Sequence, residues 1–187
     1  MIIALIVPVL WITWLIYWAV SARDVKATRW RESRTSQVLY RVPVILVALL
    51  MAAPSALPRV LTRRFVPAGG PLILLGPLLV AAGLGLAVWA RRHLGRNWST
   101  SVVVKEDHTL IRSGPYRHVR HPIYTGILLA FLGTALWIGE WRGLLAVPLM
   151  VLSFVLKSRA EERRMRETFP EYQQYERDTA ALVPFVY

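Results

Sequence analysis

Residues 114–126, GPYRHVRHPIYTG, place arginines and histidines directly before a long apolar run. The chain has four histidines and all lie within residues 93–121, namely His93, His108, His118 and His121. A second polar segment at 157–175, KSRAEERRMRETFPEYQQY, carries the adjacent carboxylates Glu161 and Glu162. Imidazole, guanidinium, phenol and carboxylate groups gathered in this way could bind a charged ligand. The alternative is that these side chains only anchor helix ends at a lipid surface.

Several other kinds of site are disfavoured by the sequence. Asp107 and His108 are adjacent instead of sharing a helical face, and no two-histidine helical motif is present, so we predict no metal site. The sequence GLG at 83–85 lies inside an apolar run with no strand before it, which predicts helix packing and not a nucleotide-binding loop. Serine, histidine and aspartate occur without the context of a nucleophile elbow, which disfavours a hydrolase triad. The absence of cysteine excludes disulfides and thiolate chemistry.

Long apolar helices must position the polar segments. The chain has 187 residues, of which 55% are hydrophobic, and this exceeds what a soluble core of that size needs. Apolar runs cover 2–20, 42–58, 65–90, 122–139 and 143–156. The last run is short for a hydrocarbon layer about 30 Å thick, so we expect it to extend through Lys157 and Arg159. The sequence therefore predicts an all-α integral membrane protein with about five transmembrane helices, the last two forming a hairpin at 139–143.

The segment that follows the fifth run has its own periodicity. Apolar and aromatic residues recur there at spacings of three and four, at Met165, Phe169, Tyr172 and Tyr175. This pattern predicts a C-terminal amphipathic helix that lies on the membrane or folds over the preceding loop, and Pro170 should break it into two pieces. Glu162 could form a salt bridge with Arg166 one turn later, which leaves Glu161 as the stronger functional candidate.

The distribution of basic residues predicts the orientation. Segments 21–41, 91–120 and 157–187 hold six, seven and six Lys or Arg, whereas segments 59–64 and 139–143 hold three and one. Because basic loops remain in the cytoplasm, we predict that the N-terminus is outside and that the C-terminus and the active site are cytoplasmic. The net charge of +12 then reflects topology and anionic lipid, with no role in nucleic-acid binding. We divide the chain into 1–90, three transmembrane helices with a basic loop, and 91–187, the catalytic region.

The polar segments taken together resemble a known family. The resemblance is carried by HLGRNWS, KEDHTLIRSGPY, RHPIYTG and the EE pair followed by FPEYQQY. In these segments the chain resembles the isoprenylcysteine carboxyl methyltransferase family, to which the membrane phospholipid methyltransferases are related. The resemblance runs from about Trp89 to the C-terminus, and Pro170 stands where the family usually has glycine. It implies a membrane enzyme that uses S-adenosylmethionine without a Rossmann domain, through a cytoplasmic cofactor-binding loop.

The resemblance also implies which residues form the site. Cofactor contacts carry over to Lys105, His108, Thr109, Leu110, Ile111, Tyr116, His121, Pro122, Ile123, Tyr124 and Glu161. The substrate-side cations of the family carry over to Arg91 and Lys157. These residue types suit a cofactor that carries a sulfonium, an ammonium and a carboxylate. If Pro122 opens a helix, His121 lies beside free backbone amides that favour an anion.

We therefore predict methyl transfer from S-adenosylmethionine to the carboxylate of a lipid-like, prenylcysteine-type acceptor at the cytoplasmic face of the membrane. A carboxylate is already ionised and needs no strong base, and Arg91 and Lys157 would pair with it. N-methylation of an aminolipid, a non-catalytic lipid-binding role, and a reductase on a similar membrane fold remain alternatives. The sequence leaves the identity of the acceptor and the oligomeric state open.

Overall fold

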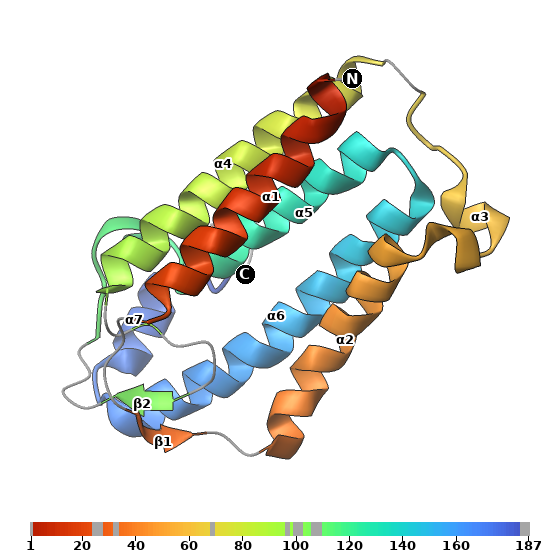
Figure 1. Ribbon diagram of the computed structural model, residues 1–187. Coiled ribbons are helices and arrows are strands. Elements are labelled where there is room, and N and C mark those ends of the chain that lie inside the picture. Colours follow the sequence, from red (N-terminus) through yellow and green to blue (C-terminus); the bar gives the residue numbers. More distant parts are fainter. Residues whose placement is uncertain are drawn as a thin grey trace.

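Figure 1 shows the computed structural model of the chain. It describes residues 2–23, 28–31, 34–67, 70–95, 98, 103–105 and 110–183. The long helices are α1 (Ile2–Ser21), α2 (Arg34–Ala52), α4 (Pro71–Leu94), α5 (Pro122–Ile138) and α6 (Trp141–Thr168). The short elements are β1 (Thr28–Arg31), the 3-10 helix η1 (Pro54–Ala56), α3 (Arg59–Thr62), β2 (Val103–Lys105), the 3-10 helix η3 (Gly114–Arg117) and α7 (Tyr172–Asp178).

The long helices form two groups that run alongside one another. Helices α1, α4 and α5 pack together, α2 packs against α6, and the contact between α5 and α6 joins the groups (Figure 1). Successive long helices run in opposite directions, so the end of α1, the start of α2, the end of α4, the start of α5 and the end of α6 lie at the same end of the molecule (Figure 1). The described parts of the three basic-rich segments therefore meet at that end.

Glycines allow α4 and α5 to approach each other closely. A methyl group added at Gly83 would collide with the backbone of Gly126 and Ala130, and one added at Gly126 would collide with the backbone of Gly83 and Ala87. Small residues of this kind let the backbones of membrane helices touch. The interpretation of the GLG sequence as helix packing is confirmed at Gly83, whereas Gly85 faces open space.

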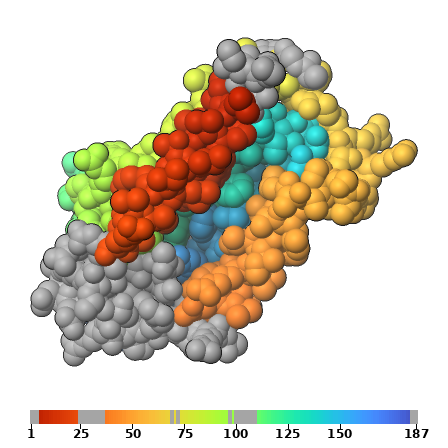
Figure 2. Space-filling view, in the orientation of Figure 1, coloured from red at the N-terminus to blue at the C-terminus, as the bar shows by residue number. Residues whose placement is uncertain are grey.

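The outer surface of the helices is apolar. Within the described residues, Ile73–Leu94 and Trp141–Thr168 are long and apolar enough to cross a membrane, and Leu5–Ser21, Gln37–Ala52 and Pro122–Ile138 are shorter apolar helices. Large hydrophobic side chains point outward along them, as expected for contact with lipid. On the face shown in Figure 2, α1 and α2 are separated by a furrow in which α5 and α6 are visible.

The structure differs from the sequence predictions in three places. Helix α6 continues to Thr168, so the first part of the predicted amphipathic helix is an extension of the fifth apolar helix. Helix α2 begins before its apolar run, and Arg41 lies on the helix and donates to the Gln37 side chain at 2.9 Å.

The fold is also not wholly α-helical. Strands β1 and β2 form a two-stranded antiparallel sheet that joins the segment after α1 to the segment after α4. Their sequences, TRWR and VVK, contain the β-branched and aromatic residues that favour strands. The strands have only four and three residues, which is too short for an alternating pattern to stand out in the sequence.

Candidate active site

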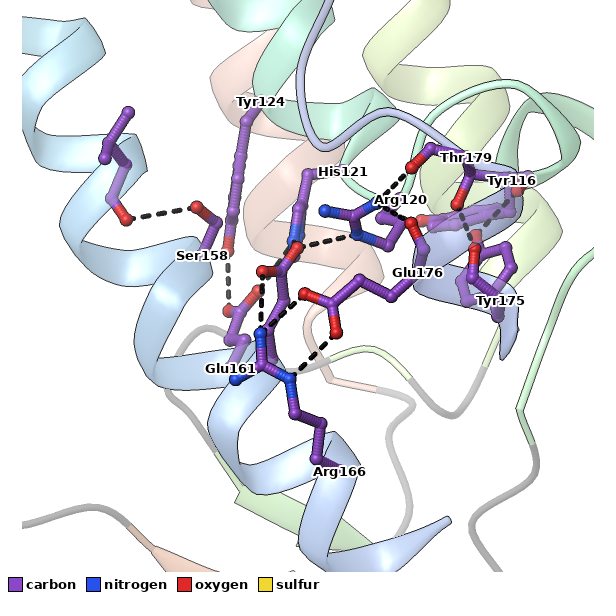
Figure 3. Close-up of polar contacts among 12 residues, drawn as sticks. Tyr116, Arg120, His121, Tyr124, Ser158, Glu161, Arg166, Tyr175, Glu176 and Thr179 are labelled. Atoms are coloured by element: carbon purple, nitrogen blue, oxygen red, sulfur yellow. Dashed lines mark hydrogen bonds and ion pairs between the residues drawn. The ribbon is translucent and has the colours of Figure 1, made fainter. Parts of the chain in front are cut away.

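Glu161 on α6 is the meeting point of side chains from two helices (Figure 3). The Tyr124 hydroxyl on α5 donates to Oε1 of Glu161 at 2.6 Å, and Nδ1 of His121 lies 3.4 Å from Oε2. The ring of Tyr124 lies between those of His121 and Phe154, with interplanar angles of 5° and 3°. The carboxylate is therefore held in a fixed orientation by a phenol and an imidazole.

Lys157 lies one helical turn before Glu161 on the same face of α6. Its Nζ is 4.0 Å from Oε1 of Glu161 and 5.3 Å from the centre of the Tyr124 ring. The side chain is 14% exposed, so its charge is largely removed from water. Carboxylate and ammonium groups thus lie side by side at the end of the molecule where the polar segments meet.

Glu162 makes a different set of contacts from its neighbour. Its Oε1 accepts a hydrogen bond from Nε of Arg120 at 2.7 Å and lies 3.1 Å from Nε2 of His121. The side chain of Glu162 is only 7% exposed, against 20% for Glu161. Arg166, expected as its partner, lies 3.9 Å from Glu162 and binds Glu176 more closely, at 2.8 and 2.5 Å. Glu162 is thus neutralised by a buried arginine, and Glu161 has the more exposed side chain.

The segment 179–183, here called the C-terminal strap, lies along the residues that precede α5. The backbone amides of Arg120 and His121 donate to the carbonyls of Ala180 and Ala181 at 2.9 and 3.0 Å. The Arg120 guanidinium also donates to the carbonyls of Glu176 and Thr179 (Figure 3). His121 is the N-cap of α5, as predicted, but its own amide is used by the strap and is not available for an anion.

His121 has a carboxylate on each side of its ring. Burial alone would lower the pKa of His121, but the hydrogen bonds with Glu161 and Glu162 outweigh this effect and raise the pKa above its usual value. Because both ring nitrogens face carboxylate oxygens, the doubly protonated imidazolium fits this position best. The charge of His121 is therefore compensated within the protein.

Tyr116 on η3 is buried, and burial first and then the charge of Glu161 raise the pKa of its phenol. Its hydroxyl lies 3.4 Å from the Ala90 carbonyl, and its own carbonyl accepts a hydrogen bond of 2.6 Å from Tyr175 on α7. Burial raises the pKa of Tyr175 to about 12, so this hydroxyl keeps its proton and remains a donor. Helix α7 therefore holds the loop that carries Tyr116.

His93 at the end of α4 contacts the same loop. Its Nε2 is 2.8 Å from Oγ of Ser113, and its ring lies over Gly114, where any added methyl group would collide with the imidazole. Gly114 has a φ of 58°, a backbone conformation that favours glycine. The glycine before the RHP motif is thus explained by its backbone conformation and by its contact with His93.

Arg91 is buried at the junction of α1 and α4. It donates to the Gly95 carbonyl at 2.7 Å and to the Ser21 carbonyl at 2.5 Å, and it lies 4.4 Å from the centre of the Trp98 ring. The substrate-side role that the resemblance implies for Arg91 stays a prediction. Its contacts show that it links the ends of two helices.

The remaining predicted contacts have different outcomes. Lys105 lies at the end of β2, where the backbone alone is described, and His108 and Thr109 lie outside the described residues. Ile111 packs against the main apolar cluster, Pro122 and Ile123 are buried at the start of α5, and Leu110 is half-buried in the irregular segment before η3. The structure therefore brings together His121, Tyr124, Lys157 and Glu161, with Tyr116 beside them.

The chemistry of this group of residues suits S-adenosylmethionine. Glu161 can pair with an ammonium group, and the rings of Tyr116 and Tyr124 can face a sulfonium. Among the described residues, no cluster of His, Asp and Glu could hold a metal ion. These residue types could hold a cofactor of the kind that the sequence resemblance implies.

A sequence model of a known family matches this region of the chain. The model is described as phospholipid methyltransferase and matches residues 72–172, from α4 through the first residue of α7. The chain belongs to the phospholipid methyltransferase family. The matched residues include every described side chain around Glu161.

Several known proteins are similar to this chain over about half of its length or slightly more. The chain is 36% identical over 115 residues to the cobalt-zinc-cadmium resistance protein CzcN of Cupriavidus metallidurans, covering 58% of this chain and 50% of that protein. It is 32% identical over 121 residues to the protein-S-isoprenylcysteine O-methyltransferase of Saccharomyces cerevisiae, covering 60% and 48%. With the Schizosaccharomyces pombe protein of the same name it shares 29% identity over 96 residues, covering 49% and 41%. The chain spans about half the length of these relatives.

A solved structure has the same fold. It is described as the eukaryotic intramembrane Ras methyltransferase ICMT, isoprenylcysteine carboxyl methyltransferase, and matches with a TM-score of 0.55 at 20% identity. The match covers 83% of this chain and 55% of that chain. The resemblance to isoprenylcysteine carboxyl methyltransferases is confirmed, and with it the helical fold of an integral membrane protein.

Proposed function

We propose that this phospholipid methyltransferase family member transfers a methyl group from S-adenosylmethionine to the carboxylate of a lipid-like acceptor of the prenylcysteine type. The observation that carries the proposal is the contrast between the two adjacent glutamates. Glu162 is buried and neutralised by Arg120, whereas Glu161 is more exposed and is held by Tyr124, His121 and Lys157. Glu161 is thus the carboxylate of the pair that is suited to a cationic ligand.

S-adenosylmethionine, when bound, supplies an electrophilic methyl group on a positively charged sulfur. Glu161 would bind its ammonium group, and the rings of Tyr116 and Tyr124 would lie against its positive charge. His121 would hold the other carboxylate oxygen of Glu161, since its Nδ1 lies 3.4 Å from Oε2. These contacts bind and orient the cofactor and need no proton transfer.

Lys157 and Arg91 are proposed to act on the acceptor. Bringing a carboxylate into a partly buried site is unfavourable unless a cation accompanies it, and Lys157 lies beside Glu161 at the reacting end of the site. Arg91 already donates to two carbonyls, so it would also fix the wall formed by α1 and α4. An ionised carboxylate oxygen can form the new bond directly, so the reaction requires alignment and not a general base.

The proposal places the site at the cytoplasmic face, with five membrane spans and the N-terminus outside. The three basic-rich segments support this orientation, because their described parts lie at one end of the helices (Figure 1). A charged cofactor from the cytoplasm and an acceptor from the lipid could then meet at the same surface.

N-methylation of an aminolipid is the second candidate, and the description of the matching family as phospholipid methyltransferase favours it. An amine must lose a proton before or during methylation, so it would need an acceptor for that proton. The ammonium of Lys157 would also weaken binding of the protonated form of such an acceptor, because the two groups carry like charge.

Transfer of a radiolabelled methyl group separates the two candidates. The purified protein in lipid nanodiscs would be given labelled S-adenosylmethionine with either N-acetyl-S-farnesylcysteine or phosphatidylethanolamine. We expect label in a base-labile methyl ester of the first compound. Label that appears only in base-stable product from phosphatidylethanolamine would refute the carboxylate proposal.

Substitution of Lys157 by methionine gives a second test. The variant keeps much of the apolar stem and removes the charge, so ester formation should fall at least about tenfold while S-adenosylhomocysteine binding is nearly unchanged. Arg91→Met should lower ester formation as well, with an added loss of thermal stability from its two carbonyl contacts. An unchanged rate in the Lys157 variant would remove its proposed role.

A further inference from the structure

Tyr40 on α2 lies against the ammonium group of Lys157. The centre of its ring is 5.8 Å from Nζ of Lys157, and the centre of the Tyr124 ring on α5 is 5.3 Å from the same nitrogen. Tyr40 is 6% exposed, so its ring is a fixed part of the interior. The ammonium is thus contacted by aromatic rings from two different helices.

The position of Tyr40 is fixed through the backbone of α2. Oγ of Ser153 on α6 donates to the Tyr40 carbonyl at 2.7 Å, and Ser153 is 2% exposed. Ser153 precedes Lys157 by one helical turn, so the contact fixes α2 against α6 next to the lysine. Helix α2 therefore has a defined register at the site.

Aromatic rings suit the role of holding a lysine that must bind an anion. A lysine has a flexible stem of four carbons, and fixing its ammonium requires a neighbour that attracts the cation. Glu161 already attracts the ammonium, at 4.0 Å, and offsets part of its charge. A ring face attracts the cation through its quadrupole without adding a further negative charge, so Tyr40 can hold the ammonium without weakening its pairing with a substrate carboxylate.

We propose that Tyr40 is a positioning residue of the acceptor site, where with Tyr124 it holds the Lys157 ammonium in place to meet the carboxylate of the acceptor. The inference rests on the proposed function for its account of the acceptor. It extends the site to α2, which lies outside residues 72–172, the region matched by the family model. Helix α2 also lies within residues 1–90, for which we predicted no catalytic role from the sequence. The furrow between α1 and α2 (Figure 2) has this helix as one wall.

The test compares Tyr40→Leu with Tyr40→Phe, which keeps the ring and removes only the hydroxyl. With N-acetyl-S-farnesylcysteine as the acceptor, Tyr40→Leu should raise the KM for the acceptor about fivefold or more, and Tyr40→Phe should remain within about twofold of wild type. Affinity for S-adenosylhomocysteine should be unchanged in both. Leu39→Ala, on the exposed side of α2, is the matched control and should leave the KM unchanged.

A second measurement does not depend on the acceptor. The chain has only three lysines, Lys26, Lys105 and Lys157, so protein grown with ε-¹³C-lysine should give three resolvable signals. The signal of Lys157 should be shifted by the ring currents of the two tyrosines, and Lys157→Arg identifies it. Tyr40→Leu should move this signal toward the free-lysine position, and Tyr40→Phe should preserve it.

The outcomes separate the two proposals. If Tyr40→Leu leaves the Lys157 signal in place, or moves it without raising the KM for the acceptor, the positioning role is wrong. If the wild-type protein forms no methyl ester, the proposed function is wrong. In that case the proposed role of Tyr40 toward an acceptor carboxylate is also wrong. The Lys157 signal then shows only whether the Tyr40 ring holds the lysine.

Discussion

Replacement of Glu161 by glutamine is the sharpest perturbation of the candidate site. Glutamine keeps the size of the side chain and can still accept a hydrogen bond from Tyr124, which lies 2.6 Å from the carboxylate. It removes the negative charge, which lies 3.4 Å from His121 and 4.0 Å from Lys157. The substitution therefore tests the charge of Glu161 separately from its shape.

The size of the effect follows from the contact that would be lost. A charge-assisted hydrogen bond to a ligand contributes about 1.5–3 kcal/mol, and each 1.4 kcal/mol corresponds to about tenfold in affinity. We expect the dissociation constant for S-adenosylhomocysteine to rise about 10- to 100-fold. Isothermal titration calorimetry of the detergent-solubilised protein measures this directly.

Glu162→Gln is the matched control on the adjacent residue. It removes the charge that Arg120 contacts at 2.7 Å in a buried pair, and such a loss can cost about 3–5 kcal/mol of folding stability. We expect a lower unfolding temperature with near-normal cofactor affinity below that temperature. Equal titration curves for wild type and Glu161→Gln, or a larger loss of affinity in Glu162→Gln, would refute the assignment of roles to the two glutamates.

Three further predictions concern pH, packing and orientation. Because the pKa of His121 is raised, its protonated form stabilises the fold fully below about pH 6.5, and this stabilisation is lost as the pH rises through the raised pKa. His121→Gln should therefore flatten the fall in unfolding temperature above about pH 6.5, and an unchanged slope would contradict this. Gly83→Ala should lower the free energy of unfolding, measured in denaturant, by about 1–3 kcal/mol, whereas Gly85→Ala should not lower it. Equal stabilities of the two variants would show that the contact between α4 and α5 is not tight. Because the chain has no cysteine, single cysteines can be labelled with an impermeant thiol reagent to test the orientation. His118→Cys should react only from the cytoplasmic side and Val60→Cys only from the outside, and the reverse pattern would overturn the orientation.

The parts of the fold that the sequence predicted are those fixed by local chemistry. Pro122 begins α5 because proline suits the first turn of a helix, and the turn between α5 and α6 falls at Gly139, whose φ of 67° favours glycine. The apolar runs identified the helices because each side chain exposed to lipid must be apolar. None of these inferences required contacts between distant residues.

The parts that the sequence missed depend on such contacts. The C-terminal strap pairs with residues 119–121 through backbone hydrogen bonds, which leave no trace in the side-chain pattern. Tyr40 is one aromatic residue in an apolar helix, and nothing in its neighbours shows that it faces Lys157. Arg120 was visible in the RHP motif, but its pairing with Glu162 could not be deduced, because the two residues lie 42 positions apart.

The continuity of α6 has a consequence for how the protein responds to its bilayer. Lys157 and Glu161 lie on the same helix as the apolar residues that precede them, so at about 1.5 Å per residue the backbone of Glu161 stands about 7.5 Å beyond that of Leu156 along the helix axis. No proline lies between Leu149 and Glu161, so a tilt or sinking of this part of the helix that relieves hydrophobic mismatch should move the charged groups with it. Membrane thickness would therefore set the depth at which a lipid-borne carboxylate can be reached, and the rate of methyl transfer should have an optimum in acyl-chain length.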